Sequence, residues 1–291
     1  VFHSPLLHTF ATEQPWLSGL VRQELSALLD AQAKSITSQR LYGAMTAQGT
    51  YNLRVLTLGQ ESIERDGKPI SMSDWRATSA REMFLYLLFN GAQTREGFSL
   101  TFWPDSSVKQ VRSNFHTTLY RARQALGENV IVFYDDLYFI NPDVECTADA
   151  AEMKQLAAQA RLMPPRDART EDLWRHAAHL YRGDFLPSLD DDWVLPLREQ
   201  FQELYIEALV GVGACARARG DLREAVSAYK RALRVDPYRE DIHRAILTCY
   251  GQKGEKKKIA HHLQQLQELL WQELAVKPSA ETVALARSLL H

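Results

Sequence analysis

The stretch SVKQVRSNFHTTLYRARQALG, residues 107–127, combines a helical apolar period with an unusual polar side. Its apolar residues are spaced three or four apart, as on one face of an α-helix. They are Val108, Val111, Phe115, Leu119, Ala122 and Leu126. Glycine commonly follows the last turn of a helix, and Gly127 stands there. The sequence therefore predicts one amphipathic helix over residues 107–126.

The opposite side of this helix carries no negative charge, because no acidic residue occurs from Ser106 to Gly127. Its polar arc consists of Gln110, Ser113, Asn114, Thr117, Tyr120, Arg121 and Gln124, flanked by Lys109, Arg112, His116 and Arg123. A helix of about 20 residues is roughly 30 Å long, enough to lie in a major groove. Asn, Gln and Arg can bind base edges, and Ser, Thr and Tyr can bind phosphates. A solvated face that binds nothing is an equally good reading of the helix alone.

The elements around this helix favour the DNA-binding reading. LRVLTLG (53–59) is typical of a strand, and Asp66-Gly67 of a tight turn. Ser79–Glu82 has the pattern of a capping box and opens an apolar helix, REMFLYLLFN. Two β-prone runs joined by Asp135-Asp136 predict a hairpin. Strands, a helix, a short helix, a long polar helix and a hairpin follow one another in a winged helix-turn-helix.

From Asp149 onwards the chain has a helical pattern, and one part of it fits a 34-residue helical-hairpin repeat. The residues at tetratricopeptide offsets are Leu209, Gly213, Ala225, Tyr229, Ala232 and Pro237. We expect Gly213 and Ala225 to face each other where two antiparallel helices approach most closely. Tyr250 and Gly254 recur one period later, so a second hairpin is expected there.

Two long stretches of the sequence resemble known domain families, in agreement with these observations. Residues 53–146 resemble an OmpR-type winged helix, through LRVLTLGQESIERDGKPI, SAREMFLYLL, Trp103-Pro104-Asp105 and VRSNFHTTLYRARQALG. Residues 149–290 resemble the bacterial transcriptional activator domain, through LYRGDFLPSLDDDWV, LREQFQELYIEAL, GDLREAVSAYKRALRVDPYREDIHRAIL and LAVKPSAETVALAR. The combination resembles transcriptional regulators of the SARP/BTAD type, which are Streptomyces antibiotic regulatory protein-like.

This resemblance implies a mainly α fold with a small β component. We expect a helical segment or linker at 1–50, which could end a missing upstream domain. A winged-helix DNA-binding domain at 51–147 and a tetratricopeptide-like repeat domain at 148–291 follow. The implied function is sequence-specific binding of duplex promoter DNA by a transcription regulator, which we expect to be an activator in the cytoplasm. The implied roles of the repeat domain are homodimerisation, regulation and contact with RNA polymerase.

The predicted DNA-binding residues all lie on helix 107–126. They are Lys109, Arg112, Ser113, Asn114, His116, Thr117, Tyr120, Arg121 and Arg123. Arg112, Asn114, Arg121 and Arg123 match the family pattern, whereas the others are placed by the helical period. Two features depart from that pattern: the wing tip is acidic at Asp135-Asp136, and Gly97 weakens the positioning helix.

Composition and the absence of certain motifs exclude several classes of function. The 291 residues carry 34 Lys plus Arg against 36 Asp plus Glu, so bulk positive charge cannot drive DNA binding. The longest apolar runs are too short to cross a bilayer, and no signal peptide is evident. No phosphate loop, nucleophile elbow or zinc signature is present, so we expect no enzyme, metal or cofactor.

The alternative function is a protein- or ligand-binding sensor module whose winged helix contacts protein instead of DNA.

Overall fold

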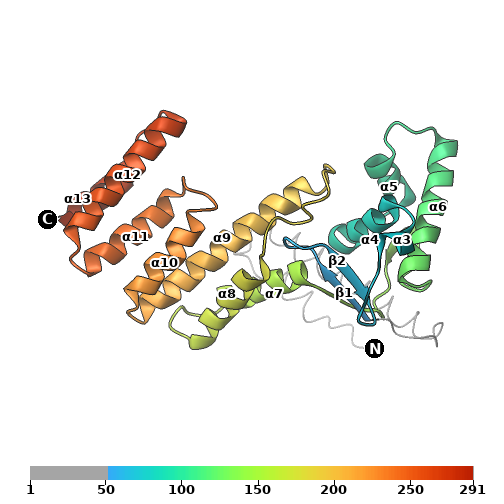
Figure 1. Cartoon of the computed structure of the whole chain (residues 1–291), viewed down its shortest axis with the longest axis horizontal. Helices are drawn as coiled ribbons and strands as arrows, with labels where there is room; N and C mark the ends of the chain where they lie inside the picture. Colours follow the sequence, from blue (N-terminus) through green and yellow to red (C-terminus); the bar gives the residue numbers. More distant parts are fainter. Residues whose placement is uncertain (1–51, 291) are drawn as a thin grey trace, which may run out of the picture.

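The computed structural model describes residues 52–290, so the segment predicted at 1–50 lies outside the described residues. Figure 1 shows an elongated molecule, with a mixed α/β domain at one end and helical hairpins extending to the other. The elements of the first domain are β1 (Asn52–Leu56), β2 (Ser62–Arg65), β3 (Lys68–Pro69), α3 (Met72–Trp75), α4 (Thr78–Asn90), α5 (Arg95–Phe102), α6 (Val108–Leu126), β4 (Ile131–Tyr134), β5 (Leu137–Ile140) and β6 (Glu145–Ala148).

The strands form two separate sheets. The larger has the order β3-β2-β1-β6, in which β1 pairs antiparallel with β2 and parallel with β6. The smaller is the β4-β5 hairpin, which is the wing. Asp66-Gly67 and Asp135-Asp136 all have positive φ, as the type I′ turns of two-residue hairpins require. The sequence predictions of a turn at 66–67 and a hairpin across 135–136 are confirmed.

The capping box predicted at Ser79–Glu82 is wrong. Helix α4 begins at Thr78, and its N-cap is Ala77, which makes no side-chain capping bond. The left-handed backbone of Arg76 ends α3, and the extended Ala77 leads directly into α4. Ser79 therefore already lies inside the first helical turn. Capping boxes occur instead at Ser71, before α3, and at Ser107, before α6.

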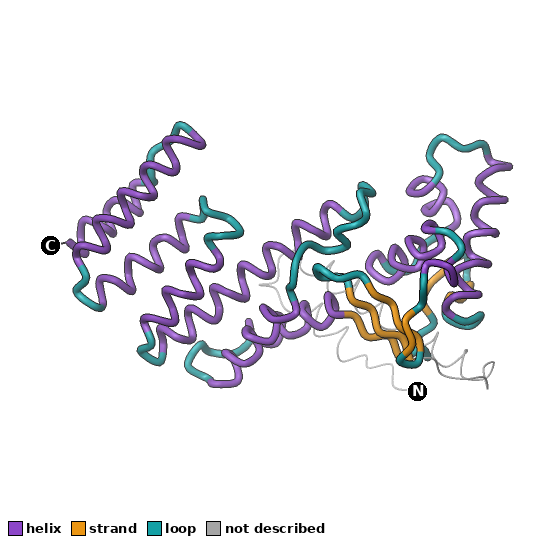
Figure 2. Tube along the Cα trace, in the orientation of Figure 1, coloured by secondary structure: helices purple, strands orange, loops and turns teal. Residues whose placement is uncertain are grey.

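The second domain is entirely helical within the described residues, as the purple helices of Figure 2 show. Its helices are α7 (Asp149–Arg161), α8 (Ala168–Leu180), α9 (Leu195–Ala218), α10 (Leu222–Ala232), α11 (Glu240–Gln252), α12 (Lys256–Leu274) and α13 (Ala280–Leu290). The predicted fold class, mainly α with a small β component and helical repeats, is confirmed.

Glycine lets helices of the repeat domain approach closely. A Cβ on Gly213 would lie 2.4 Å from Cε1 of Tyr229 on α10, and one on Gly211 would lie 2.6 Å from the Trp174 ring on α8. Real side chains do not approach so closely. The side chain that packs against Gly213 and requires a glycine there is therefore that of Tyr229. We had expected Ala225 in this place, and both residues belong to the predicted repeat pattern.

One buried carboxylate joins the two domains. Asp149, the first residue of α7 and only 8% exposed, accepts hydrogen bonds from the Thr57 amide at 2.9 Å, the Thr57 hydroxyl at 2.8 Å and the Leu58 amide at 3.0 Å. These donors end the first strand of the winged helix. Because buried polar groups are costly when unpaired, this carboxylate holds the start of the repeat domain against the sheet.

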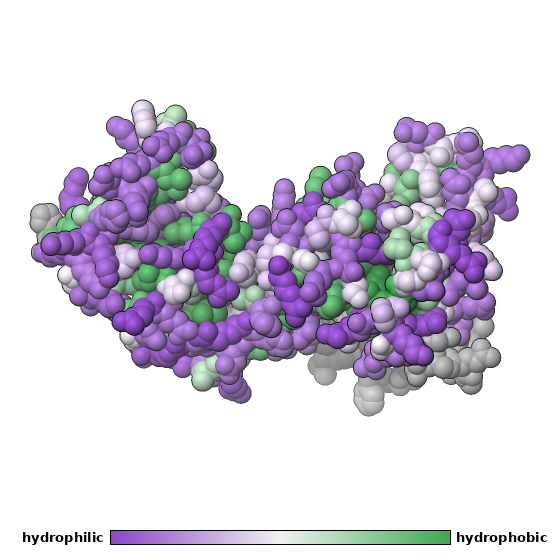
Figure 3. Space-filling model, viewed as in Figure 1, coloured by the Kyte–Doolittle hydropathy of each residue, from purple (hydrophilic) through white to green (hydrophobic). Residues whose placement is uncertain are grey.

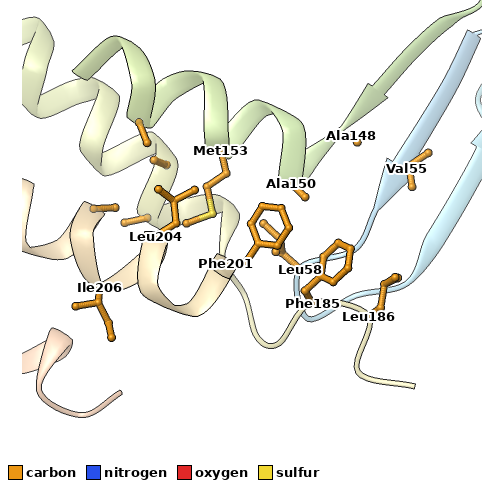
Figure 4. Packing of buried hydrophobic residues seen from close by; sticks show 14 of the residues in the cluster. Val55, Leu58, Ala148, Ala150, Met153, Phe185, Leu186, Phe201, Leu204 and Ile206 are labelled. Atoms are coloured by element: carbon orange, nitrogen blue, oxygen red, sulfur yellow. The ribbon is translucent and has the colours of Figure 1, made fainter. Parts of the chain in front are cut away.

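The loop between α8 and α9 completes the joint. Leu58 and Phe185 form an isolated β-bridge, flanked by bonds from Gly59 N to Asp184 O and from Leu186 N to Thr57 O, each 2.9 Å long. The Phe185 ring stacks on Phe201 of α9, and Figure 4 shows these rings beside Leu58. The hydrophobic core is therefore continuous from one domain into the other.

Two partly buried carboxylates, Glu82 and Asp191, interact electrostatically near this joint. Burial raises the pKa of Glu82 on α4, and the charge of Asp191 raises it further. Burial also raises the pKa of Asp191, helped by Asp192 and Asp190. The neighbouring Trp193 ring packs edge-on against Tyr86 at 5.4 Å. Like charges across a partly buried interface destabilise it when both are ionised.

Replacing Asp149 by alanine should leave buried donors at Thr57 and Leu58 without an acceptor. We expect the free energy of unfolding to fall by about 3 kcal/mol or more, measured by urea denaturation. Asp172→Ala, which removes an exposed carboxylate from α8, is the control and should change little. Equal stability of the two variants would contradict the structural role given to Asp149.

Glu82→Gln should stabilise the folded chain at neutral pH. The folded pKa of Glu82 lies above its unfolded value, so ionisation costs more in the folded state. That cost is present at neutral pH and vanishes as the pH falls below the usual glutamate range. The gain in Tm over wild type should therefore be seen at pH 7 and shrink near pH 4. A gain in Tm for Glu82→Gln that is the same at both pH values would refute this explanation.

Candidate nucleic-acid interface

Helix α6 is held by one buried face. Phe115, Leu119, Ala122 and Leu126 are buried, as the apolar period predicts. Val108 departs from the prediction because it is 88% exposed, and Val111 is only half-buried. The first turn of α6 therefore projects beyond the core. Ser107 caps this turn, with its amide donating to Gln110 Oε1 at 3.0 Å.

The predicted DNA-binding residues divide by exposure. Seven of the nine are exposed, namely Lys109, Arg112, Ser113, Asn114, His116, Thr117 and Tyr120. Arg121 and Arg123 are half-buried. Within residues 52–290, the side chains of Arg112, Ser113, Asn114 and Thr117 form no hydrogen bond or ion pair. The outer edge of the winged helix, on the right in Figure 3, carries mainly hydrophilic side chains.

Arg123 has a partner inside the protein. Its Nε and one terminal nitrogen donate to the Ile131 carbonyl at 2.9 and 2.8 Å. The guanidinium therefore attaches the wing to the last third of α6. Helical spacing could not reveal this, because Ile131 follows the end of the helix. Contact of Arg123 with DNA stays a prediction, and its observed role is positional.

The wing is fixed at its base and exposed at its tip. The Tyr138 ring lies 4.8 Å from Phe115 and 4.6 Å from Phe133, and its backbone pairs with Gln93 before α5. Burial raises the pKa of the Tyr138 phenol. Asp135 and Asp136 are both exposed at the tip. The wing is therefore packed against the domain at its base and presents two carboxylates to solvent at its tip.

A cleft separates α6 from this hairpin. It has a volume of about 520 Å³, and α6 contributes His116, Tyr120, Arg123 and Gln124 to its lining. We call it the wing-side cleft. On its other wall stand Phe133 and the carboxylate of Glu128. The positioning helix α5 is capped by Thr94, whose hydroxyl accepts from the Gly97 amide at 3.0 Å. Gly97 thus lies in a capped first turn, where a glycine weakens a helix less than in its middle.

The described residues contain no group of three or more His, Cys, Asp and Glu side chains arranged to hold a metal ion. His243 and His262 are buried and paired, with 2.9 Å between Nδ1 and Nε2. A carbonyl only accepts, so His243 Nε2 donates to Pro237 O, and its Nδ1 accepts from His262. Burial lowers the pKa of both rings, that of His262 to about 4. The pair is therefore neutral and structural.

No helix among residues 52–290 combines the length and apolarity needed to cross a membrane.

Comparisons with known proteins agree with this architecture. Residues 148–290 match the family model of the bacterial transcriptional activator domain. No curated protein matches the chain by sequence. Among solved structures, Mycobacterium tuberculosis EmbR, determined in complex with a low-affinity phosphopeptide, is similar with a TM-score of 0.68 and 19% identity. The similarity covers 84% of this chain but only 65% of the EmbR chain. At this identity, the match establishes the fold alone.

The resemblance noted in the sequence is therefore confirmed from two directions, a family match for the helical repeats and a fold match that covers most of the chain. Residues 148–290 therefore form a bacterial transcriptional activator domain, and the fold match agrees with a winged helix before it.

Proposed function

We propose that this protein binds duplex promoter DNA in a sequence-specific manner and activates transcription, with α6 in the major groove. The observation that carries the proposal is the exposed, acid-free arc of α6, on which Ser113, Asn114 and Thr117 have no partner within residues 52–290. If this helix face were only solvated, nothing would favour the absence of Asp and Glu over 19 residues of a slightly acidic chain.

The chemistry of the arc fits a duplex. At 19 residues, α6 is about 28 Å long, comparable with one turn of B-DNA. Asn114 has the amide that reads adenine through two hydrogen bonds, and Arg112 and Arg121 have guanidinium groups suited to guanine. Lys109, Ser113, His116, Thr117 and Tyr120 supply donors for phosphates or bases. The proposed activity is binding and not catalysis.

The wing contributes differently in this proposal. Two exposed carboxylates at Asp135-Asp136 repel phosphates, so the tip stays away from the sugar–phosphate backbone. Arg123 supports the DNA-binding surface by holding the base of the wing. We assign homodimerisation, regulation and contact with RNA polymerase to the helical repeats, because these are the roles that the family resemblance implies. We place this activity in the cytoplasm.

A second candidate function rests on the acidic wing and the net charge of −2. In it, the winged helix contacts another protein, and the repeats serve as a sensor module. A salt titration of binding to random duplex DNA separates the two candidates. DNA binding requires the affinity to fall steeply and linearly on a logarithmic salt scale. Negligible binding at low salt would favour the protein-binding module.

Asn114→Ala should weaken binding to a duplex selected from a random pool by about 1–3 kcal/mol if Asn114 reads a base. Binding to unrelated duplexes should change little, since the lost contact is specific to one base. Fluorescence anisotropy with both duplexes measures this difference. Asn90→Ala, at the end of α4, is the control and should bind both duplexes as wild type does. Unchanged discrimination by Asn114→Ala would remove this residue from base readout.

A further inference from the structure

A second cleft borders the last turns of α6 and is lined by no residue of the wing. It lies between α6, α3 and the β2-β3 turn, and has a volume of about 560 Å³. The side chains that define it are Arg65, Lys68, Arg76, Asp66, Asp74 and Gln124. We call it the α3-side cleft. Figure 1 shows the β2 and α3 elements on the inner side of α6.

Gln124 connects this cleft to the proposed DNA-binding surface. It is exposed, belongs to the acid-free arc, and lines both the wing-side and the α3-side cleft. Apart from Gln124, the two clefts are built from different elements, and both border the last turns of α6. A helix in the major groove has a sugar–phosphate backbone on each side. A cleft at the edge of the proposed DNA-binding surface is therefore a place where one backbone can lie.

The charges of the α3-side cleft fit a phosphate. Lys68 and Arg76 are exposed, and neither forms an ion pair or side-chain hydrogen bond within the described residues. The two carboxylates of the cleft are used locally, since Asp66 accepts from the Asn52 amide at 3.0 Å and Asp74 from the Ser71 amide at 2.8 Å. The cations thus remain available to an outside anion.

Arg65 and Arg76 are held in unusual ways. An Arg65 terminal nitrogen donates to the Ala125 carbonyl at 3.0 Å, which joins the end of β2 to the end of α6. Arg76 ends α3 with φ of 58°, a left-handed conformation in which glycine is the usual residue. Position 76 therefore has a long cationic side chain, although its backbone conformation favours glycine.

We propose that the α3-side cleft binds one phosphate backbone of the duplex read by α6, through Lys68 and Arg76. This inference rests on the proposed DNA-binding function and extends it to a part of the winged helix outside the helix-turn-helix and wing. These contacts supply affinity that is independent of sequence, because phosphates are the same along all duplexes. They add two cations to a proposed DNA-binding surface whose wing tip is acidic.

The test compares two doubly substituted full-length chains. Lys68→Ala/Arg76→Gly removes both cations, and glycine suits the left-handed backbone at 76, so folding is preserved. Arg54→Ala/Arg182→Ala removes the same charge from a separate cleft between the sheet and α8. Affinity for a selected and a random duplex is measured by fluorescence anisotropy from 50 to 200 mM salt, and thermal unfolding checks that each variant is folded.

We expect Lys68→Ala/Arg76→Gly to weaken binding to both duplexes by the same factor. Its slope of log affinity against log salt should be smaller in magnitude by about 1.8, which is about 0.9 for each lost phosphate contact. Its affinity should therefore fall about tenfold less than that of wild type over this salt range. The control should keep the wild-type slope. Phosphate ethylation should also weaken wild type at positions where it no longer affects the variant.

Other outcomes overturn the proposal in distinguishable ways. Salt-dependent binding by wild type, with the same slope for both double variants, refutes the cleft and leaves DNA binding by α6 intact. Loss of discrimination with an unchanged slope shows that Lys68 and Arg76 read bases, which also refutes a phosphate site. No binding of wild type to either duplex at low salt overturns the proposed function and this inference together.

Discussion

The position of Phe115 governs the functional surface of this protein. Its ring is fully buried in the middle of α6, 5.5 Å from Phe98 of α5 and 4.8 Å from Tyr138 of the wing. Because side chains on a helix have fixed angular positions, burial of this ring sets the rotation of α6 about its axis. That rotation directs Ser113, Asn114 and Thr117 to solvent. Helices α5 and α6 and the wing thus meet at one aromatic contact.

The winged helix and the repeats are joined through buried polar bonds as well as apolar packing. Asp149 accepts from the end of β1, and the loop before α9 pairs with Leu58 and Gly59. Gly59 allows this contact because a Cβ there would lie 2.5 Å from the Gly183 nitrogen. Interfaces that bury hydrogen-bonded charge resist sliding, since movement would leave donors unpaired. The first hairpin of the repeats is therefore an extension of the winged-helix domain rather than a tethered neighbour.

The sequence predicted the elements far better than it predicted their interactions. The sequence predicted the two hairpin turns, the buried face of α6 and the repeat pattern, because each of them depends on residues close together in the chain. The capping box at Ser79 was wrong because the backbone of Arg76 and Ala77, which no pattern revealed, starts α4 two residues earlier. The exposure of Val108 was missed because an apolar residue in helical register is buried only where another element covers it.

The amino-acid order by itself determined which side of residues 107–126 is free of negative charge and which small residues allow helices to pack. Those properties belong to a single helix or a single hairpin, so they are visible in the spacing of residues. Only the tertiary structure decided that Arg123 holds the wing and that Lys68 and Arg76 border the same helix. These pairings join residues brought together by sheet pairing and core packing, and their distances depend on the whole domain rather than on any local period.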